Sequence, residues 1–526
     1  MKSRFQMLIA GFALAVFVGA IGLRSCATAK GIPLFGTDSC VFLPQTVPFY
    51  ERGELINEVW RPARHIDPLG KGRMVYHGFL YPMILTLLMW RGDYLAMVGS
   101  LAILHAVSAL LLCGLLWNFA KCWKWRMTPG QLLLVPLLGW AGANYTQGGL
   151  GRPEPLAAII VMGSALVMSR SHLRWHGCIA GIGIGLATAS DPIVGVFGGL
   201  AFAAYAGWRF PARRCLLEIA GAAVVSMLAL ACCFLWYPYS VGEWFRGTSG
   251  MGQGALAVGE RGHYWQNFLV ECFSYGSSWF LPGTVLLVVW SGVRLVRRQR
   301  RAGQGPCSPL VFYASLLLTG AAALRFVLYL PWARYNVLPF VPLGFLLIFH
   351  ELGQESPRGR PSPYRFAAVI VLAIASLGLP TDLFQRYHTL RFGLDLRAAR
   401  SLFNAVRKNH PDEVIAMNQS LFTLTEDYRN IVFWKNEAPP AEATILLDSQ
   451  FSQRQLRPVA IDGFRLAADH FNSRPPSLLG VTVPLRDRGC GFAVYLRDGA
   501  EVRTVIPNHE DLPGAGRVIG TSDGAQ

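Results

Sequence analysis

Ionisable residues in this sequence gather at the ends of long apolar segments, where they are otherwise rare. There are four such places: Asp38 after the first apolar segment, Arg152-Pro153-Glu154-Pro155, Ser190-Asp191-Pro192 and Arg334-Tyr335. Alternation of the segments across a membrane puts all four on one side. An ionisable group is costly to keep beside hydrocarbon, so a cluster on one face usually marks a functional site. The pattern therefore favours a membrane enzyme over an anchored soluble protein.

Asp38 has the residue type of a general base. A carboxylate at the membrane surface can take a proton from a hydroxyl nucleophile and so activate it. Its neighbours Gly36 and Ser39 equally suit a plain turn, in which aspartate is common for structural reasons. The local sequence leaves both interpretations open.

Two arginines have the chemistry of a phosphate clamp, because a guanidinium binds phosphate through paired hydrogen bonds. Arg152 opens an apolar segment beside Glu154, and Arg334 lies at the start of a later one. Both have structural alternatives, since proline and an acid are ordinary at a helix start and an arginine can reach the membrane interface. Asp191 likewise has the pattern of a helix cap followed by proline.

Metal ligation has little support in the sequence. The 11 cysteines are scattered and show no spacing typical of a metal site. His77 precedes a short apolar segment on the same side as Asp38, without a cluster of further ligands. A Mg²⁺ or Mn²⁺ ion held jointly by Asp38 and a substrate phosphate stays open.

The composition is that of a membrane protein. Of 526 residues, 52% are hydrophobic and only 15% are charged, and the mean hydropathy is +0.35. Soluble domains carry about a quarter charged residues. Roughly eleven apolar segments recur in the first three-quarters of the chain, mostly of about 17–25 residues and so long enough to cross a bilayer.

The net charge of +17 comes largely from short basic connectors between these segments. Such loops stay in the cytoplasm and therefore orient the bundle. Nucleic-acid binding would instead need a contiguous basic face, and we expect no nucleic-acid partner. The connectors hold Lys121, Lys124 and Arg126; Arg170 and Arg174; Arg209, Arg213 and Arg214; Arg294, Arg297, Arg298, Arg300 and Arg301; and Arg358, Arg360 and Arg365.

The apolar run that ends at Trp90 has about fourteen residues, which suits an interfacial or re-entrant helix better than a span. Treating it as non-crossing places every later basic connector inside. The first span, Phe5 to Leu23, then runs from inside to outside. Ala27-Thr28-Ala29 resembles a signal-peptidase site, and we favour a retained helix over a cleaved signal.

Two long connections are predicted outside, a first outer loop over 25–75 and a second over 237–279. The second is rich in glycine from Gly247 to Gly254 but lacks the lysine of a P-loop. A mobile loop that closes over a bound substrate and a flexible linker both fit this composition.

Charges and prolines return beyond residue 380, and no further spanning segment follows. Residues 396–406 have helical periodicity, whereas 413–417 and 443–447 have the character of buried strands. The expected fold is an all-α polytopic membrane bundle over 1–380, with about eleven transmembrane helices and an interfacial helix. A small extracytoplasmic α/β domain with a disordered tail would follow over 381–526.

These motifs, in this order, resemble the GT-C superfamily of polytopic glycosyltransferases, especially the branch of the aminoarabinose and protein O-mannosyl transferases. In that family an acid follows the first helix, as Asp38 does here, although Ser39 stands where a second acid is frequent. The Pro-Pro-Leu-Tyr-Pro segment of the family is matched by His77-Gly78-Phe79-Leu80-Tyr81-Pro82. The Arg-Pro-Glu helix start and the late Arg-Tyr…Pro motif are matched by Arg152-Pro153-Glu154 and Arg334-Tyr335-Asn336-Val337-Leu338-Pro339.

The resemblance implies an inverting glycosyltransferase that moves a sugar from a polyprenyl-phosphate donor to a glycan, lipid or protein acceptor on the extracytoplasmic face. It implies Asp38 as the catalytic acid–base residue. Arg152 and Arg334 would hold the donor phosphate. The other donor-site residues would be Glu154, His77, Tyr81 and Asp191.

A polytopic transporter or lipid flippase is the alternative. It would place its charges near the bilayer midplane on broken, repeated helices rather than at one face. By analogy with the resembled branch, we expect a multi-pass protein surrounded by lipid in a bacterial inner (plasma) membrane. Its N-terminus would be cytoplasmic and its C-terminal domain extracytoplasmic.

Overall fold

The computed structural model of the chain describes most of its first 302 residues and part of the remainder. The described residues are 2–30, 39–122, 153–170, 175–258, 281–302, 347–348, 350–352, 362–370, 387, 390, 396–434, 438–448, 460–469, 477–478, 481–482 and 493–499. Three predicted site residues, Asp38, Arg152 and Arg334, lie outside these ranges. Two of the apolar segments that we expect to span the membrane, 131–146 and 310–330, also lie outside them.

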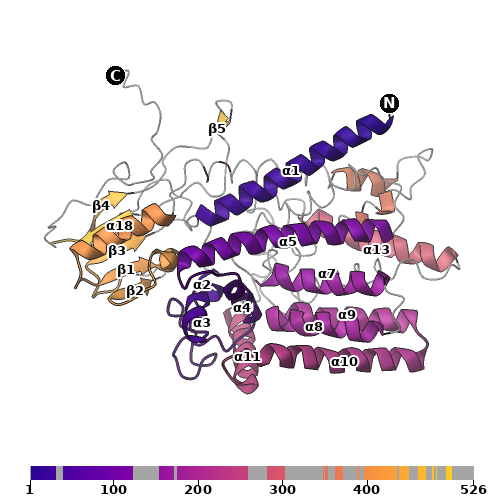
Figure 1. Ribbon diagram of the computed structural model, residues 1–526, viewed down its shortest axis with the longest axis horizontal. Helices are drawn as coiled ribbons and strands as arrows, with labels where there is room; N and C mark the ends of the chain where they lie inside the picture. The colour runs from indigo at the N-terminus through magenta and orange to yellow at the C-terminus, as the bar shows by residue number, and fades with distance from the viewer. Residues whose placement is uncertain are drawn as a thin grey trace.

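Long helices form the main body of the described structure. Figure 1 shows α5, α7, α8, α9 and α10 running alongside one another, and α1 packs against α5. Short connections join α7 to α10 in sequence, so neighbouring helices run in opposite directions. The long helices are α1 Lys2–Lys30, α5 Tyr94–Cys122, α7 Glu154–Arg170, α8 His176–Ser190, α9 Pro192–Arg209, α10 Ala212–Phe234 and α13 Leu281–Ala302.

Helices α8 and α10 pack closely because α8 presents glycine to α10 at every fourth position. A Cβ atom at Gly181 would lie 2.6 Å from the carbonyl oxygen of Ala222, and one at Gly185 would lie 2.5 Å from that of Ser226. Small residues at this spacing let helix backbones approach each other in a membrane. Van der Waals contact then holds the helices together, since burial against another helix gains little over lipid.

The outer surface of α10 is apolar. Among the described residues, α10 is the one helix long and apolar enough to cross a bilayer by length and composition, with a mean hydropathy of 2.2. Its side chains Leu216, Leu217, Met227 and Leu228 are each more than half exposed. Contact with lipid favours such a surface, whereas contact with water would not.

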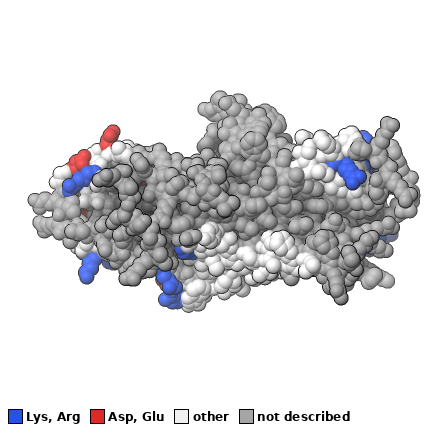
Figure 2. All heavy atoms as spheres, turned by 90° about the horizontal axis from the view of Figure 1, so that it is seen from above, with Lys and Arg blue, Asp and Glu red and all other residues white. Residues whose placement is uncertain are grey.

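The described charged side chains are scattered along the molecule. In Figure 2 the Lys and Arg side chains visible on this face lie near both ends and also between them. The basic connector with Arg213 and Arg214 joins the end of α9 to the start of α10. The Ser190–Asp191 junction lies at the opposite end of α9, so this acid and this basic connector occupy different ends of the bundle.

One end of the bundle carries short helices in place of a plain loop over 25–75. Helix α1 continues to Lys30, and α2 Ser39–Phe42 and α3 Thr46–Arg52 follow further along. Helix α4 Leu80–Leu87 has 8 residues. At about 12 Å it is too short to cross a bilayer, which agrees with the predicted non-crossing helix.

The prediction of a loop or linker from Gly247 to Gly254 is wrong, because this segment is part of α11 Val241–Val258. Ser240 Oγ accepts a hydrogen bond from the backbone N–H of Glu243, and Glu243 Oε2 accepts one from that of Ser240, both at 3.2 Å. This capping box starts the helix. In Figure 1, α11 runs across the end of α10 rather than along it.

A mixed sheet forms beyond residue 410. Its strand order is β2-β1-β3-β7-β4, with β1 parallel to β2 and β3, and with β7 antiparallel to β3 and β4. The strands are β1 Ile415–Asn418, β2 Ile431–Trp434, β3 Ile445–Asp448, β4 Phe464–Asp469 and β7 Ala493–Arg497, and a separate antiparallel pair is β5 Ser477–Leu478 with β6 Val481–Thr482. Helix α18 Leu396–Asn409 precedes the sheet and buries Leu402, Phe403 and Val406. The helix and the two strands predicted in this region are confirmed as elements.

One apolar core joins this sheet to the end of the bundle that carries α2, α3 and α4. It contains Leu43 and Phe79 from that end, Tyr94 at the start of α5, and Leu447 of β3. Phe422 of the 3₁₀-helix η5 Gln419–Leu424 lies in the same core, with its ring centroid 5.3 Å from that of Tyr94. The sheet region is therefore packed onto this end of the bundle.

Candidate active site

The sequence motifs meet around Pro153, at the end of the bundle that carries α2 and α4. Ser190 Oγ donates a hydrogen bond of 3.1 Å to the carbonyl oxygen of Pro153. A Cβ atom at Gly78 would lie 3.4 Å from Pro153 Cγ and 2.7 Å from Phe42 Cε1. Phe42 ends α2, which starts one residue after Asp38. Four separate parts of the sequence thus come together in one place.

Gly78 is required by two independent constraints. Its φ of +87° lies in the left-handed region, where a side chain is strained. Phe42 also leaves no space for a Cβ atom. The resembled family has two prolines where this chain has His77 and Gly78, so here the turn before α4 depends on a left-handed glycine instead.

His77 and Tyr81 lie on either side of this turn. The ring centroid of His77 is 6.2 Å from those of both Phe42 and Tyr76. Tyr81 is buried within α4, and its backbone N–H donates to the carbonyl oxygen of Gly78 at 3.2 Å. The structure therefore brings His77 beside α2, the helix that follows Asp38.

Asp191 caps the start of α9. Its Oδ1 accepts hydrogen bonds from the backbone N–H groups of Ile193, at 2.9 Å, and Val194, at 3.4 Å. Pro192 occupies the first helical position, where its missing N–H costs nothing. The buried carboxylate of Asp191 therefore serves as the N-cap of α9. Its role in donor binding stays a prediction.

For the other predicted site residues, the structure describes at most the neighbouring residues of the chain. Glu154 begins α7 directly after the buried Pro153, and its side chain lies outside the described residues. Arg152 is covalently joined to Pro153, and Asp38 to the first residue of α2. Arg334 lies outside the described ranges, so its place at the site stays a prediction.

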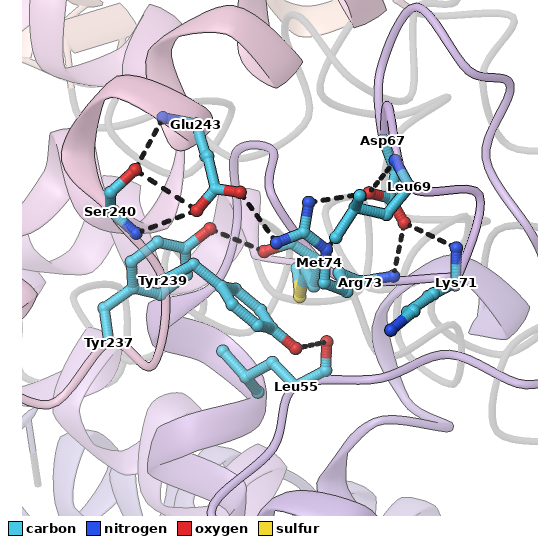
Figure 3. Close-up of polar contacts among 10 residues, drawn as sticks. All are labelled: Leu55, Asp67, Leu69, Lys71, Arg73, Met74, Tyr237, Tyr239, Ser240 and Glu243. Carbon is cyan, nitrogen blue, oxygen red and sulfur yellow. Dashed lines mark hydrogen bonds and ion pairs between the residues drawn. The ribbon is translucent and has the colours of Figure 1, made fainter.

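An ion-pair network that sequence reasoning missed joins α11 to the segment before α4 (Figure 3). Asp67, fully buried, accepts hydrogen bonds from Arg73 Nε at 3.1 Å and Arg73 Nη2 at 3.0 Å. Arg73 Nη1 donates to Glu243 Oε1 at 2.7 Å. Asp67 Oδ2 also accepts from the backbone N–H groups of Lys71 and Arg73, both at 3.0 Å. Arg73 is thus the cation shared by two acids from different parts of the chain.

The pair of Arg73 and Glu243 stabilises the charged form of both side chains. The hydrogen bond from Arg73, together with those within the capping box at Ser240, lowers the pKa of Glu243. Burial opposes the charge of Arg73, but its bonds to Glu243 and Asp67 outweigh burial and raise its pKa. The Ser240-x-x-Glu243 spacing is the sequence signal that could have predicted a helix start at this place.

Two tyrosines that precede α11 form hydrogen bonds to the segment between α3 and α4. Tyr237 Oη donates to the carbonyl oxygen of Met74 at 2.7 Å, and Tyr239 Oη donates to that of Leu55 at 3.0 Å (Figure 3). Burial raises the pKa of both hydroxyl groups, so they remain neutral donors. Helix α11 is therefore held in place by hydrogen bonds and an ion pair.

Within the part of the chain that the structure describes, no group of three or more His, Cys, Asp and Glu side chains could hold a metal ion.

No protein-family model and no curated protein sequence matches the chain. Three similar solved structures are the apo oligosaccharyltransferase of Archaeoglobus fulgidus, ArnT from Cupriavidus metallidurans bound to undecaprenyl phosphate, and the arabinofuranosyltransferase AftD from Mycobacteria. Their sequence identities to this chain are 12%, 13% and 11%, and their TM-scores are 0.48, 0.45 and 0.43.

The matches cover different shares of these proteins. They span 79%, 94% and 95% of this chain, against 64%, 98% and 40% of the oligosaccharyltransferase, ArnT and AftD chains. Two of the three names describe glycosyltransferases, the class that the sequence motifs resemble. At TM-scores below 0.5 the likeness does not assign the activity of any of them to this chain.

Proposed function

We propose that the chain is a polytopic membrane glycosyltransferase of the GT-C type. It moves a sugar from a polyprenyl-phosphate-linked donor to an acceptor at the extracytoplasmic membrane face, with inversion at the anomeric carbon. The observation that carries this proposal is the convergence of α2, the His77–Gly78 turn, Pro153 and Ser190 at one end of the bundle. A lipid-linked donor needs a hydrocarbon-facing bundle for its chain and polar groups at the membrane surface for its phosphate and sugar.

In the proposed reaction, Asp38 accepts the proton of an acceptor hydroxyl as that oxygen attacks the anomeric carbon. A carbon–oxygen bond forms there while the bond to the phosphate oxygen breaks. The polyprenyl phosphate leaves with the bonding electrons, and attack from the opposite side inverts the configuration.

The arginines act on the leaving group. Negative charge grows on the phosphate as its bond to the sugar breaks, and Arg152 and Arg334 stabilise that charge. Glu154 orients Arg152 or binds sugar hydroxyl groups. The proposed donor site is completed by His77, Tyr81 and Asp191.

The proposal requires no metal ion, but if the reaction uses Mg²⁺ or Mn²⁺, Asp38 would hold that ion together with the donor phosphate. Carboxylate and phosphate oxygens are the ligands that these ions prefer. The ion would help neutralise the phosphate. Removal of divalent cations with EDTA tests whether the reaction needs such an ion. Turnover that survives EDTA would show that the arginines stabilise the leaving phosphate without a metal ion.

The acceptor is a glycan, a lipid or a protein that reaches the site from the extracytoplasmic side. We place the protein in a bacterial inner (plasma) membrane with a cytoplasmic N-terminus and an extracytoplasmic C-terminal region. Among the described helices, the separation of the Ser190–Asp191 junction from the Arg213 and Arg214 connector supports this orientation.

The test is release of polyprenyl phosphate by the purified full-length protein in lipid. A panel of radiolabelled polyprenyl-phosphate sugars would be offered with an extract of bacterial envelope as the acceptor source. We expect release with one sugar of the panel, together with transfer of the label to the acceptor in the opposite anomeric configuration.

A parallel measurement separates the transferase from the transporter. Fluorescent polyprenyl-phosphate sugar would be followed for movement between the two leaflets of proteoliposomes. Movement that depends on the protein, without release of polyprenyl phosphate from any donor, would contradict the transferase and support a flippase.

A further inference from the structure

The region after α18 contacts the start of α5 through a carboxylate. Glu426 Oε1 accepts a hydrogen bond of 2.7 Å from the backbone N–H of Tyr94, the first residue of α5. Backbone N–H groups at a helix start lack partners in the helix, and a negative charge there is favourable. Glu426 thus closes the N-terminus of α5 although it lies 332 positions away in the sequence.

Arg400 holds Glu426 in this position. Its Nη1 donates to Glu426 Oε1 at 2.7 Å, and its Nη2 donates to Oε2. Arg400 Nη1 also donates to the carbonyl oxygen of Thr423 at 3.0 Å. The side chains of Arg400 and Glu426 are 17% and 27% exposed. A bidentate, partly buried ion pair is more stabilising than an exposed one.

A chain of hydroxyl groups runs through the same contact toward the segment between α2 and α3. Tyr428 Oη donates to Tyr94 Oη at 2.7 Å, and Tyr94 Oη donates to the carbonyl oxygen of Pro44 at 3.3 Å. Tyr94 is almost fully buried. The side chain of Tyr94 therefore links Tyr428 to the connection that follows α2 by hydrogen bonds.

A second contact reaches α2 directly. Cys40 Sγ donates to the backbone carbonyl oxygen of Gln419 at 3.0 Å, and Gln419 Nε2 donates to the carbonyl oxygen of Val59 at 3.4 Å. Cys40 is fully buried and lies two positions after Asp38. The 3₁₀-helix η5 thus bonds to the helix that follows the proposed catalytic acid.

We propose that Glu426 is a positioning residue for the transfer reaction, which makes this inference rest on the proposed function. With Arg400 and Tyr428 it holds α2 and the start of α5 in register, and α2 begins at the residue after Asp38. The region after α18 is then a working part of the catalytic unit rather than an appended domain. Misplacement of a reacting group by about 1 Å can cost a hundredfold in rate.

The adjacent residue provides a matched control. Asp427 pairs with Arg407 of α18 at 2.9 Å and with Arg429 at 2.7 Å, so these ion pairs stay within α18 and the region that follows it. Glu426→Ala and Asp427→Ala each remove a carboxylate and its ion pairs from the same loop. In the described structure, Glu426 accepts a hydrogen bond from the first residue of α5, whereas the ion pairs of Asp427 do not reach α5.

The first measurement is turnover of the full-length variants in lipid, read as release of polyprenyl phosphate. We expect Glu426→Ala to lower kcat by about tenfold or more while KM for the donor changes by less than about twofold. Glu426→Gln keeps an oxygen acceptor for the Tyr94 N–H and should recover most of kcat. Equal kcat for Glu426→Ala and Asp427→Ala would overturn the proposal.

The second measurement is amide hydrogen exchange, which does not depend on activity. Glu426→Ala should accelerate exchange in α2 and in the first turn of α5, and Asp427→Ala should leave both unchanged. If wild type shows no turnover with any donor but this difference appears, the function is wrong and the positioning contact stands. Unchanged exchange in Glu426→Ala would overturn the inference whatever the turnover.

Discussion

At the scale of single residues, the candidate site depends on side chains that fix the backbone. Ser190 ties the junction of α8 and α9 to Pro153, and Gly78 lets the turn before α4 approach Phe42. Asp191 caps α9 at the same place. Of the reactive groups that we propose, Arg152 is joined to Pro153 by one peptide bond, and Asp38 is joined in the same way to Ser39, the first residue of α2.

Asp191 offers a test that separates capping from charge. Asp191→Ala should lower the free energy of unfolding by about 1 kcal/mol, because the N–H groups of Ile193 and Val194 lose their acceptor. Asp191→Asn keeps an acceptor oxygen and should retain wild-type stability. Thermal unfolding in detergent would measure both, and equal losses for the two variants would contradict the capping role. Lower donor affinity in Asp191→Asn at unchanged stability would add a role in donor binding.

The cap at Asp191 could be predicted from the sequence because Ser-Asp-Pro is a local signal. The approach of Gly78 and Ser190 to Pro153 could not, because it depends on how distant helices pack. Resemblance to a family supplied the order of the motifs but not their geometry. The positions of Asp38, Arg152 and Arg334 within the site stay predictions.

At the scale of elements, α11 is the main departure from expectation. Glycine-rich composition suggested a loop, yet Gly247 and Gly250 lie where the helix touches the backbone of the segment before α4. In a helix, glycine at a contact position permits close packing, and composition alone cannot distinguish this from flexibility. The Ser240-x-x-Glu243 capping box was the local signal in favour of a helix.

The ion pair between Arg73 and Glu243 should make the attachment of α11 depend on pH. The pKa of Glu243 is lowered in the folded protein, so its contribution to stability is complete above its ordinary pKa of about 4.5. That contribution is lost as the pH falls through the lowered value. The difference in thermal stability between wild type and Glu243→Gln should therefore be constant near neutral pH and vanish in acid.

Glu54 provides the control for this experiment. It pairs with Arg52 at 3.6 Å, and both side chains are about half exposed, so Glu54→Gln should change stability little at any pH. A Glu243→Gln difference that grows in acid would have the wrong sign for a lowered pKa and would contradict the assigned ion pair.

At the scale of the whole molecule, an apolar bundle meets a sheet at the end where the motifs gather. The apolar and sparsely charged character of the bundle was evident from composition and from charge placement, because both are properties of the sequence alone. The helix in 396–409 and strands β1 and β3 could be predicted from periodicity. The bonding of Glu426 to Tyr94 could not, because the two residues are far apart in sequence and neither lies in a motif.

Packing of the bundle can be tested with one chemical change at two positions. Gly181→Ala puts a Cβ atom 2.6 Å from the carbonyl oxygen of Ala222, which should destabilise the bundle by roughly 1–3 kcal/mol. Gly199→Ala in α9 meets nothing within 4 Å and should gain up to about 1 kcal/mol in helix propensity. Thermal unfolding by circular dichroism would show the opposite signs, and equal shifts would contradict the close contact of α8 with α10.

The central claim is that the end of the bundle beside α2 is a transferase site with Asp38 as its base. The most direct measurement is the rate of polyprenyl phosphate release by Asp38→Asn at saturating donor, compared with Asp412→Asn, the same change at an exposed residue of the sheet region. We predict a loss of about a hundredfold or more for Asp38→Asn and wild-type turnover for Asp412→Asn, with both variants folded. Wild-type release by Asp38→Asn would contradict the account.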